Sequence, residues 1–390
     1  MTVASLSRSW SAALAAVSLM SSTATFADSA ASAPGSHREA ASVIFDTDMY
    51  TDIDDVLALG MLHALQDRGE VKILAVTLST EGRWTAPYID LIDTFYGHRD
   101  IPLGTVRGGV AAEKFEQKIL QDGPQPYSPH GINYTQYLAQ LTNKNGSLVY
   151  PHKLRDSALA EEAVHLLRRV LSTQPDHSVV MIQVGFCTNL ARLLESEPDE
   201  LSKLDGRALV KSKIRLLSMM AGRFADIRST DRVLAAGSSE FNLMTDQEAA
   251  EKLFAKWPTP IVVSGSEVGS QMLVTESSVL QAYRYVEHHP IAQTYEYFSS
   301  FIREVMKDPS LLHDHATYDL TSVLYAARPD EGYFSLSKPG KISVLPNGGT
   351  RFDPVAGGPH RYLILTDEQK GRTLEAMSML ASQPPVTRAE

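Results

Sequence analysis

Short apolar runs alternate with helix-periodic segments along most of the chain, and this alternation limits the possible folds more than any other feature. Apolar runs typical of strands lie at 43–45, 71–78, 101–106, 179–184, 214–220 and 261–263. Helical periodicity follows at 54–66, 87–96, 158–171, 189–194 and 247–255. Strands that alternate with helices predict an α/β fold with a mostly parallel central sheet and helices on both faces.

The pattern changes in two places. Residues 107–153 are rich in Gly, Pro, Asn, Gln and Tyr, which predicts a long loop or lid. The C-terminal part is more helical at 275–307 and 319–327, and it ends in a β-rich stretch at 332–364 and a helix at 367–381. Since no internal repeat or composition break divides the chain, we expect one α/β domain over residues 41–390 with a small β-rich C-terminal decoration.

The N-terminus has the build of a secretory signal. Arg8 precedes the apolar run Ala12–Met20, and small residues lead to Thr25-Phe26-Ala27. This pattern predicts a signal peptide over residues 1–27, a flexible lead-in over 28–40 and a secreted or periplasmic protein. A disordered tail is the alternative, and the run is too short to span a bilayer.

Charge and cysteine content exclude several classes of function. The chain has 36 Lys plus Arg against 46 Asp plus Glu, a formal charge of −10, and no basic run. This balance argues against binding to nucleic acid or to an anionic membrane, and we expect a small-molecule partner. The single cysteine, Cys187, excludes an intrachain disulfide and a cysteine-based zinc cluster. A small buried residue is a better interpretation of Cys187 than a catalytic thiol.

An acidic cluster follows the first predicted strand. Five aspartates fall within ten residues, namely Asp46, Asp48, Asp52, Asp54 and Asp55. Ligands of open parallel sheets bind at the carboxyl ends of strands, and this cluster lies at such an end. Because so many carboxylates repel one another unless a cation neutralises them, and because all the ligands are oxygen, the cluster predicts a Ca²⁺ or Mg²⁺ site rather than a zinc site.

The sequence disfavours three other interpretations of the cluster. An EF-hand loop fails because Tyr50, Thr51 and Leu57 occupy the positions that need an acid or Asn, a Gly and a Glu. A phosphotransferase with an aspartyl nucleophile would have a Gly-Thr pair just beyond the cluster, which is absent here. A solvated acidic loop is disfavoured because the flanking strand and helix are both apolar.

Five segments resemble, in order, the motifs of the nucleoside hydrolases, the inosine-uridine-preferring N-ribohydrolase family. The first is Asp46-Thr47-Asp48 followed by Asp54-Asp55, with five intervening residues where the family usually has three. The others are 184–191 (VGFCTNLA), 220–222 (MAG), 240–250 (EFN…DQEAA) and 318–323 (YDLTSV). The resemblance covers roughly residues 43–330.

The resemblance implies a role for each matched residue. Asp48, Asp55, Asp319 and the backbone carbonyl of Thr188 would bind Ca²⁺, and Asp48 would also act as the general base toward water. Ribose hydroxyls would be held by Asp54, Glu240 and Asn242, with Asp46 orienting the loop. These types suit hydrolysis of an N-glycosidic bond, in which a carboxylate activates water as the sugar gains oxocarbenium character.

Two departures from the family pattern concern the rest of the site. No Asn follows the second strand, and Glu81 is the candidate for holding the sugar in its place. Tyr318 stands where many members have a His that protonates the leaving base, so His313 and His315 are the candidate acids. Each of these histidines also has a surface or capping role as its alternative. Trp84 is equally a stacking platform for a base and a core residue.

These observations leave three hypotheses. The first is a Ca²⁺-dependent ribohydrolase that releases ribose and a free base from ribonucleosides. The second is a relative that binds ribose or nucleosides without turnover, which the intact Asp48 argues against. The third is a hydrolase of another riboside or glycoside bond, including ADP-ribosyl-type substrates. A homo-oligomer is compatible with each of them.

Overall fold

The fold is built on one large sheet. The computed structural model describes residues 39–50, 52–112, 133–228, 233–306 and 315–386. The proposed signal peptide, residues 28–38 and His313 lie outside these ranges. The strands of the sheet are β1 (Ala41–Thr47), β2 (Val71–Glu81), β3 (Leu103–Ala111), β4 (Glu161–Glu162), β5 (Val179–Gln183), β6 (Ile214–Met220), β9 (Ile261–Ser264), β12 (Ser335–Leu336), β13 (Gly340–Val344), β14 (Thr350–Pro354) and β15 (His360–Ile364).

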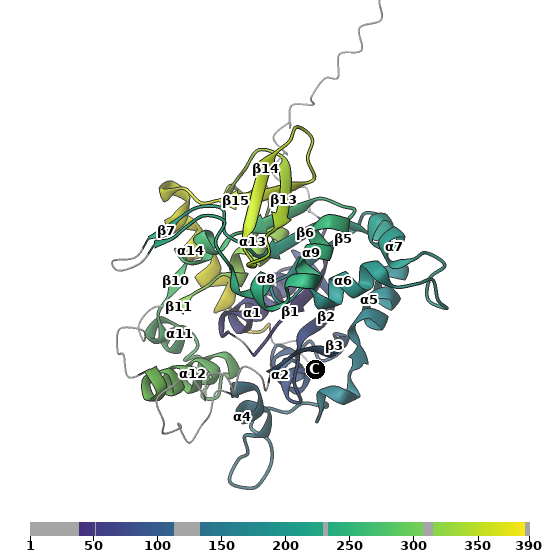
Figure 1. Ribbon diagram of the computed structural model, residues 1–390. Helices are drawn as coiled ribbons and strands as arrows, with labels where there is room; N and C mark the ends of the chain where they lie inside the picture. Colours follow the sequence, from purple (N-terminus) through teal and green to yellow (C-terminus); the bar gives the residue numbers. More distant parts are fainter. Residues whose placement is uncertain (1–38, 51, 113–132, 229–232, 307–314, 387–390) are drawn as a thin grey trace, which may run out of the picture. The chain divides into compact units, whose positions relative to one another are not determined.

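The sheet is mostly parallel, as the sequence predicts. Within the described ranges its order is β14-β13-β15-β9-β6-β5-β1-β2-β3-β4, with β12 paired to β15 (Figure 1). All pairings from β15 to β4 are parallel. The pairings of β12, β13 and β14 are antiparallel, which confirms the small β-rich C-terminal decoration.

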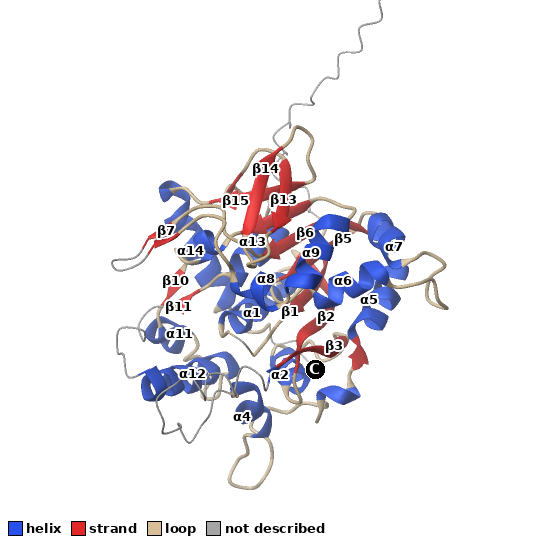
Figure 2. Cartoon of the chain, viewed as in Figure 1, coloured by secondary structure: helices blue, strands red, loops and turns tan. Residues whose placement is uncertain are grey.

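Helices cover both faces of the sheet (Figure 2). Their bounds are α1 (Asp54–Asp67), α2 (Thr85–Phe95), α4 (Tyr134–Gln140), α5 (Ala163–Ser172), α6 (Thr188–Glu195), α7 (Gly206–Lys213), α8 (Phe241–Thr245), α9 (Gln247–Lys256), α10 (Ser266–Gly269), α11 (Glu276–Ala282), α12 (Pro290–Met306), α13 (Asp319–Ala327) and α14 (Asp367–Ala381). Two short two-stranded antiparallel sheets pair β7 (Ile227–Arg228) with β8 (Val233–Leu234) and β10 (Leu273–Val274) with β11 (His315–Ala316). Across the described ranges, no helix combines the length and apolar character that crossing a bilayer requires.

Alternate residues of the central strands feed two separate cores. Val43 and Phe45 of β1 pack in one core with residues of α1, α2, α13 and α14. Ile44 packs in the other with residues of α5, α6, α7 and α9. Because successive side chains of a strand point to opposite faces, a continuous apolar run such as that of β1 indicates burial on both sides.

The region predicted as a long loop contains regular structure. Strand β3 continues to Ala111, and α4 begins after Asn133, whose side chain accepts a hydrogen bond from the backbone N–H of Gln136 at 2.9 Å. Tyr134 and Leu138, one helical turn apart, are buried. The polar composition hid this short amphipathic helix, and residues 113–132 lie outside the described ranges.

Two helix predictions need correction. The helix predicted over 158–171 begins at Ala163, because the side chain of Glu162 caps it by accepting from the N–H of His165 at 2.8 Å. Helix α7 was not predicted. Its signal is Asp205, which caps the N–H of Ala208 at 2.8 Å and is followed by the buried pair Leu209 and Val210.

Candidate active site

A polar cavity of about 310 Å³ lies at the carboxyl ends of the central strands. Its lining residues come from the ends of β5 and β6, from the loop after β1 and from the first turns of α1, α8 and α13. Its lining is Asp48, Asp52, Asp54, Asp55, Val184, Met220, Arg223, Glu240, Phe241, Asn242, Ser266, Tyr318 and Asp319. We call this space the acidic cavity.

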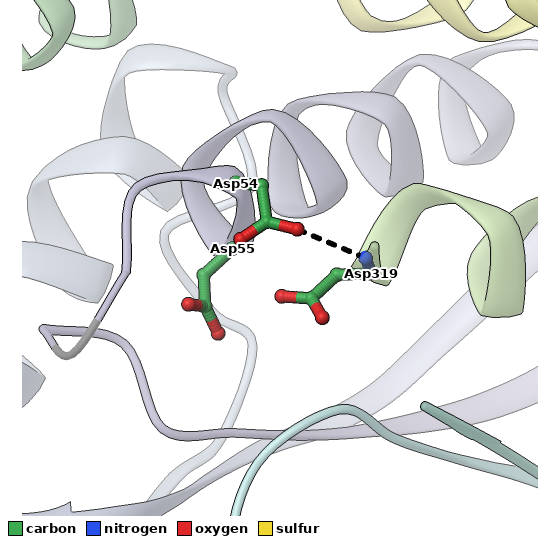
Figure 3. Close-up of side chains that lie close together, drawn as sticks. All are labelled: Asp54, Asp55 and Asp319. Carbon is green, nitrogen blue, oxygen red and sulfur yellow. Dashed lines mark hydrogen bonds between the residues drawn. The ribbon is translucent and has the colours of Figure 1, made fainter. Parts of the chain in front are cut away.

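Two distant segments meet in the acidic cavity. Asp54 is the first residue of α1, and its Oδ2 accepts hydrogen bonds from the backbone N–H groups of Tyr318 at 2.7 Å and Asp319 at 3.0 Å. Figure 3 shows Asp54, Asp55 and Asp319 side by side at the starts of α1 and α13. A carboxylate at a helix N-terminus accepts otherwise unpaired N–H groups and benefits from the helix dipole. Asp54 therefore joins the first acidic motif to the last.

The carboxylates of this cluster disfavour one another's charge. One ligand oxygen from each of Asp54, Asp55 and Asp319 lies within 4.8 Å of the others, and all three residues are buried. Burial raises the pKa of Asp54 well above its usual range, and the charge of Asp52 raises it further. Burial raises the pKa of Asp55 and of Asp319 in the same direction, followed by the charges of Asp48 and Asp54 respectively.

These residues suit a hard divalent cation. Asp55 accepts a hydrogen bond from the Thr47 hydroxyl with Oδ1, whereas its buried Oδ2 has no partner among the described residues. Buried carboxylate oxygens that share one small space and lack positive partners match the all-oxygen donor set that Ca²⁺ and Mg²⁺ prefer. The group brought together by position is Asp54, Asp55 and Asp319, with Asp48 in the same cavity.

Asp48 is held by close packing of its backbone. Its carbonyl accepts a hydrogen bond from the Thr80 hydroxyl at 3.1 Å. A Cβ at Gly185 would lie 2.4 Å from the backbone nitrogen of Asp48 and 2.6 Å from the Ser79 hydroxyl, so only glycine fits beside it. Asp48 is only 4% exposed. The approach of the loops after β1 and β5 therefore leaves its carboxylate little freedom.

The loop between Asp48 and Asp54 is supported from the region predicted as a lid. Tyr50 has a φ of 130°, which strains a non-glycine residue, and it is nearly fully buried. Its ring stacks with that of Tyr134 of α4, with 6.4 Å between centroids, and the Tyr134 hydroxyl donates to the backbone carbonyl of Asp52 at 2.8 Å. Helix α4 thus holds the two-residue-longer acidic loop in place.

Asp46 lies beneath the cavity and takes no part in its lining. Its Oδ2 accepts hydrogen bonds from the Thr77 hydroxyl at 2.6 Å and the Asn189 amide at 2.8 Å. Burial raises its pKa to about 7, against the effect of both hydrogen bonds. The interactions of Asp46 tie β1 to β2 and α6, which is a supporting position.

Glu240 and Asn242 lie on the wall formed by α8. Glu240 caps this helix, accepting from the N–H groups of Asn242 at 3.0 Å and Leu243 at 3.2 Å. The amide of Asn242 donates to the carbonyl of Val184 at 2.9 Å, and no described residue donates to its Oδ1. Both side chains are buried and line the cavity, so each can accept hydrogen bonds from a polar ligand there.

Thr188, whose backbone carbonyl is a predicted cation ligand, is not among the residues that line the acidic cavity. It begins α6, its hydroxyl donates to Asp246 at 2.6 Å, and it lines a different cavity with Arg192 and Lys252. Val184, four residues earlier, is the residue of this motif that lines the acidic cavity. The beginning of this motif therefore lines the acidic cavity, and Thr188 lines the neighbouring one.

Glu81, Trp84 and His315 do not line the acidic cavity. Glu81 ends β2 and accepts from the N–H of Gly108 at 3.1 Å in a cavity beside Arg83. His315 lies in β11, with its ring 5.8 Å from those of Tyr295 and Phe298. His313 lies outside the described residues. Trp84 packs against the core, and the Arg83 guanidinium lies 5.0 Å above its ring.

Several lining residues were not predicted as functional. Tyr318, Phe241 and Asp52 adjoin predicted residues in sequence, so their position in the matched motifs was the available signal. Burial raises the pKa of the Tyr318 hydroxyl to about 12. Arg223 directly follows the matched segment 220–222, which was its only signal, whereas Ser266 adjoins no matched segment and carries none.

Comparison with known proteins identifies the family. The family model described as inosine-uridine preferring nucleoside hydrolase matches residues 43–378. No curated protein sequence matches the chain significantly.

Solved structures share the fold at low sequence identity. A plant nucleoside hydrolase is 18% identical with a TM-score of 0.58, over 88% of this chain and 99% of its own. A purine-preferring ribonucleoside hydrolase from Gardnerella vaginalis is 18% identical with a TM-score of 0.59, over 87% and 99%. The type III effector protein XopQ, complexed with adenosine diphosphate ribose, is 16% identical with a TM-score of 0.55, over 89% and 94%. With a family model matched over most of its length and an acidic cavity built from the motifs of that family, the chain belongs to the inosine-uridine preferring nucleoside hydrolases.

Proposed function

We propose that the protein hydrolyses the N-glycosidic bond of ribonucleosides, releases ribose and a free base, and depends on Ca²⁺. The observation that carries this proposal is the convergence of Asp54, Asp55 and Asp319, from two ends of the chain, in a cavity that also contains Asp48, Glu240 and Asn242. Carboxylates for a cation, a candidate base and sugar-binding groups are the components that such a hydrolysis requires.

The cation is assigned to the carboxylate cluster. Asp48, Asp55 and Asp319 would hold it, and Ca²⁺ rather than a softer metal follows from the oxygen-only donors. When bound, a divalent cation supplies Lewis acidity that makes water easier to deprotonate. Binding of a cation would also explain why the fold keeps carboxylates whose charges oppose one another's ionisation.

The side chains of the cavity perform the remaining work. Asp48 accepts a proton from the attacking water, which is general base catalysis. Asp54, Glu240 and Asn242 accept or share hydrogen bonds with ribose hydroxyls and so orient the sugar. As the sugar approaches the oxocarbenium-like transition state, hydrogen bonds that strengthen with ring distortion lower the barrier.

A panel of purine and pyrimidine ribonucleosides tests the proposal. The purified protein is freed of metal with a chelator, resupplied with Ca²⁺, Mg²⁺ or neither, and assayed for free ribose. We expect release with Ca²⁺ and little release without a cation. Absence of ribose from every nucleoside, with Ca²⁺ shown to be bound, would contradict the proposal.

A second candidate is hydrolysis of another riboside bond. XopQ, a structural neighbour, is complexed with adenosine diphosphate ribose, and Tyr318 here stands where a leaving-group histidine is expected. A less basic leaving group needs less protonation by the enzyme, so ribosides with acidic leaving groups suit a site without that histidine. A chromogenic riboside with an acidic phenol leaving group, compared with inosine, distinguishes the two candidates by their relative kcat/KM.

We also propose that the protein is exported. The charged start, apolar run and small residues of 1–27 support this assignment. N-terminal sequencing of the protein recovered outside the cytoplasm should begin at Asp28, and a retained Met1 would contradict it.

A further inference from the structure

An arginine lies in the wall of the acidic cavity without an acidic partner. Arg223 is only 7% exposed, and it lines the cavity together with Glu240, Ser266 and Tyr318. Its Nε donates to the Ser266 hydroxyl at 3.1 Å, and its Nη1 donates to the Ser238 hydroxyl. Among the described residues, no carboxylate forms an ion pair with it. A buried guanidinium held only by hydroxyls is unusual, because buried charges normally pair with opposite charges.

The two carboxylates whose charges interact with Arg223, those of Glu240 and Glu267, accept hydrogen bonds from backbone N–H groups. Glu240 accepts from three backbone N–H groups, those of Gly222, Asn242 and Leu243. Glu267, whose charge also interacts with Arg223, accepts from the N–H of Phe224 at 3.1 Å. An arginine that served only to balance these acids would be expected to pair with one of them directly. Two of its five N–H donors bond to described residues, so among these residues three donors remain for a ligand.

The backbone of Arg223 is fixed before any ligand binds. Its N–H donates to the Thr350 hydroxyl at 3.1 Å, and its carbonyl accepts from the Gly237 N–H at 2.9 Å and from the Thr350 hydroxyl at 3.0 Å. Gly222 before it has a φ of 68°, and a Cβ there would lie 2.6 Å from Thr350. A side chain anchored in this way loses little conformational freedom on binding an anion.

We propose that Arg223, assisted by the Ser266 hydroxyl, binds a phosphate ester on the 5′ oxygen of a ribosyl ligand. A guanidinium fork matches two oxygens of a phosphate, and the O–H of Ser266 donates a further hydrogen bond. The proposal rests on the proposed function in one respect, namely that ribose occupies this cavity. The proposal directs the vicinal 2′,3′-diol toward the carboxylate cluster and leaves C1′ to the leaving group, so the 5′ position is the one available to Arg223.

Charge in the cavity bears on this assignment. The carboxylates would repel a phosphate, and a bound divalent cation offsets part of that repulsion. The contribution of Arg223 to phosphate affinity is therefore measured in the cation-loaded protein.

Calorimetric binding of ribose 5-phosphate and of ribose to the Ca²⁺-loaded protein tests the proposal without turnover. We expect ribose 5-phosphate to bind roughly 10- to 100-fold more tightly than ribose, the worth of hydrogen bonds to a charged group. Arg223→Gln should remove most of this difference and leave ribose affinity within about threefold. Ser266→Ala, which keeps the guanidinium, should lose only part of it.

The outcomes separate the possible explanations. Arg228→Gln removes an equally charged but exposed side chain and should leave the difference intact. Equal affinity for the two ligands in the parent overturns the proposal and leaves nucleoside hydrolysis standing. A phosphate preference that survives in Arg223→Gln also overturns it and assigns the phosphate to the cation. Arginine-dependent binding of ribose 5-phosphate by a protein that hydrolyses no nucleoside would support this inference and contradict the proposed function.

Discussion

The two ends of helix α1 bury polar side chains in opposite ways. At its start, Asp54 and Asp55 meet Asp319, so charges of one sign share a small space. Near its end, His63 bonds Asp93 at 2.8 Å and Asp67 bonds His98 at 2.8 Å, so each acid has a complementary partner. One helix therefore carries both a buried like-charged cluster and two matched bonds, one buried and one partly buried.

At the matched end, the partners of the polar groups on α1 are other side chains of the protein. Burial lowers the pKa of His63 to about 3 and raises the pKa of Asp93 well above its usual range, so burial disfavours the charged form of both groups. The ring of His63 stacks with those of Tyr96 and His98, with 4.9 and 5.2 Å between ring centroids. Complementary buried groups stabilise the fold, whereas a like-charged cluster needs a ligand from outside it.

The largest expected effect is loss of turnover at the like-charged end. Asp48→Asn keeps the size of the side chain but removes its basicity, so kcat should fall by roughly 10²–10⁴-fold. The loss can be larger because Asp48 is also a proposed cation ligand. Initial rates of ribose release at saturating Ca²⁺, with bound Ca²⁺ quantified in both proteins, measure this.

The matched end supplies the control. Asp67→Asn disrupts the bond to His98 and should lower stability while leaving kcat within about twofold, because Asp67 does not line the acidic cavity. Parent-like turnover by Asp48→Asn with Ca²⁺ bound would remove Asp48 as the base.

The second prediction concerns the cation. Ca²⁺ at about 100 times its dissociation constant should raise the free energy of unfolding of the parent by about 2.7 kcal/mol. Asp319→Asn should be more stable than the parent without Ca²⁺, because one repelling charge is gone, and should gain far less when Ca²⁺ is added. Urea unfolding with and without Ca²⁺ measures both effects, and Asp67→Asn should respond to Ca²⁺ as the parent does.

The pH dependence of the cation-free protein follows from the same carboxylates. Their pKa values are raised in the folded state, so the folded protein retains protons that the unfolded chain loses. This contribution to stability is fully present below about pH 4 and is lost as pH rises. A cation-free protein whose stability increased between about pH 5 and 7 through these residues would contradict the assignment.

The third prediction separates sugar binding from metal binding. Asn242→Ala should reduce kcat/KM by a factor that corresponds to a loss of about 1–3 kcal/mol of transition-state stabilisation, because hydrogen bonds to the sugar are lost. Ca²⁺ affinity should stay unchanged, since Asn242 is not a proposed ligand. Kinetics and Ca²⁺ titration of the same preparation distinguish this result from general misfolding.

Local sequence patterns predicted most of the fold. Val43–Phe45, with acids immediately after it, locates both a doubly buried strand and the cavity at its carboxyl end, because apolar runs and strand ends are local properties. The antiparallel C-terminal strands were likewise visible as a β-rich stretch. Helix α7 was missed because it spans only two turns and its cap was the sole signal.

The site was harder to predict because it depends on turns. Val184, just after β5, lines the acidic cavity, whereas Thr188 lines a different one, and no spacing in the sequence reveals which end of the motif faces the ligand. Glu81, at the end of β2, pairs with Ala111 of β3. It lines a separate cavity together with Arg83. Arg223 depends on contacts with Ser238, Ser266 and Thr350, which only the folded chain brings together.

The smallest expected effect lies at the matched end of α1 and has the opposite pH sign. His289 is buried against Tyr283 and Phe95, with ring centroids at 4.3 and 4.5 Å. Its Nδ1 accepts from the backbone N–H of Ile291 at 3.2 Å, and its Nε2 bonds the Tyr285 hydroxyl at 2.7 Å. This arrangement suits the neutral ring, and burial lowers its pKa to about 3.

Because the unfolded chain takes up a proton below about pH 6.5 and folded His289 does not, the stability it contributes is present above that pH and is lost as pH falls toward 3. The expected slope is about 1.4 kcal/mol per pH unit for this one group. Urea unfolding of the Ca²⁺-loaded parent and of His289→Gln at about pH 7, 6 and 5 should show a shallower decline for the variant. Parallel declines would mean that His289 is protonated as readily in the folded protein as in the unfolded chain, and the contrast between the two ends of α1 would then not extend to His289.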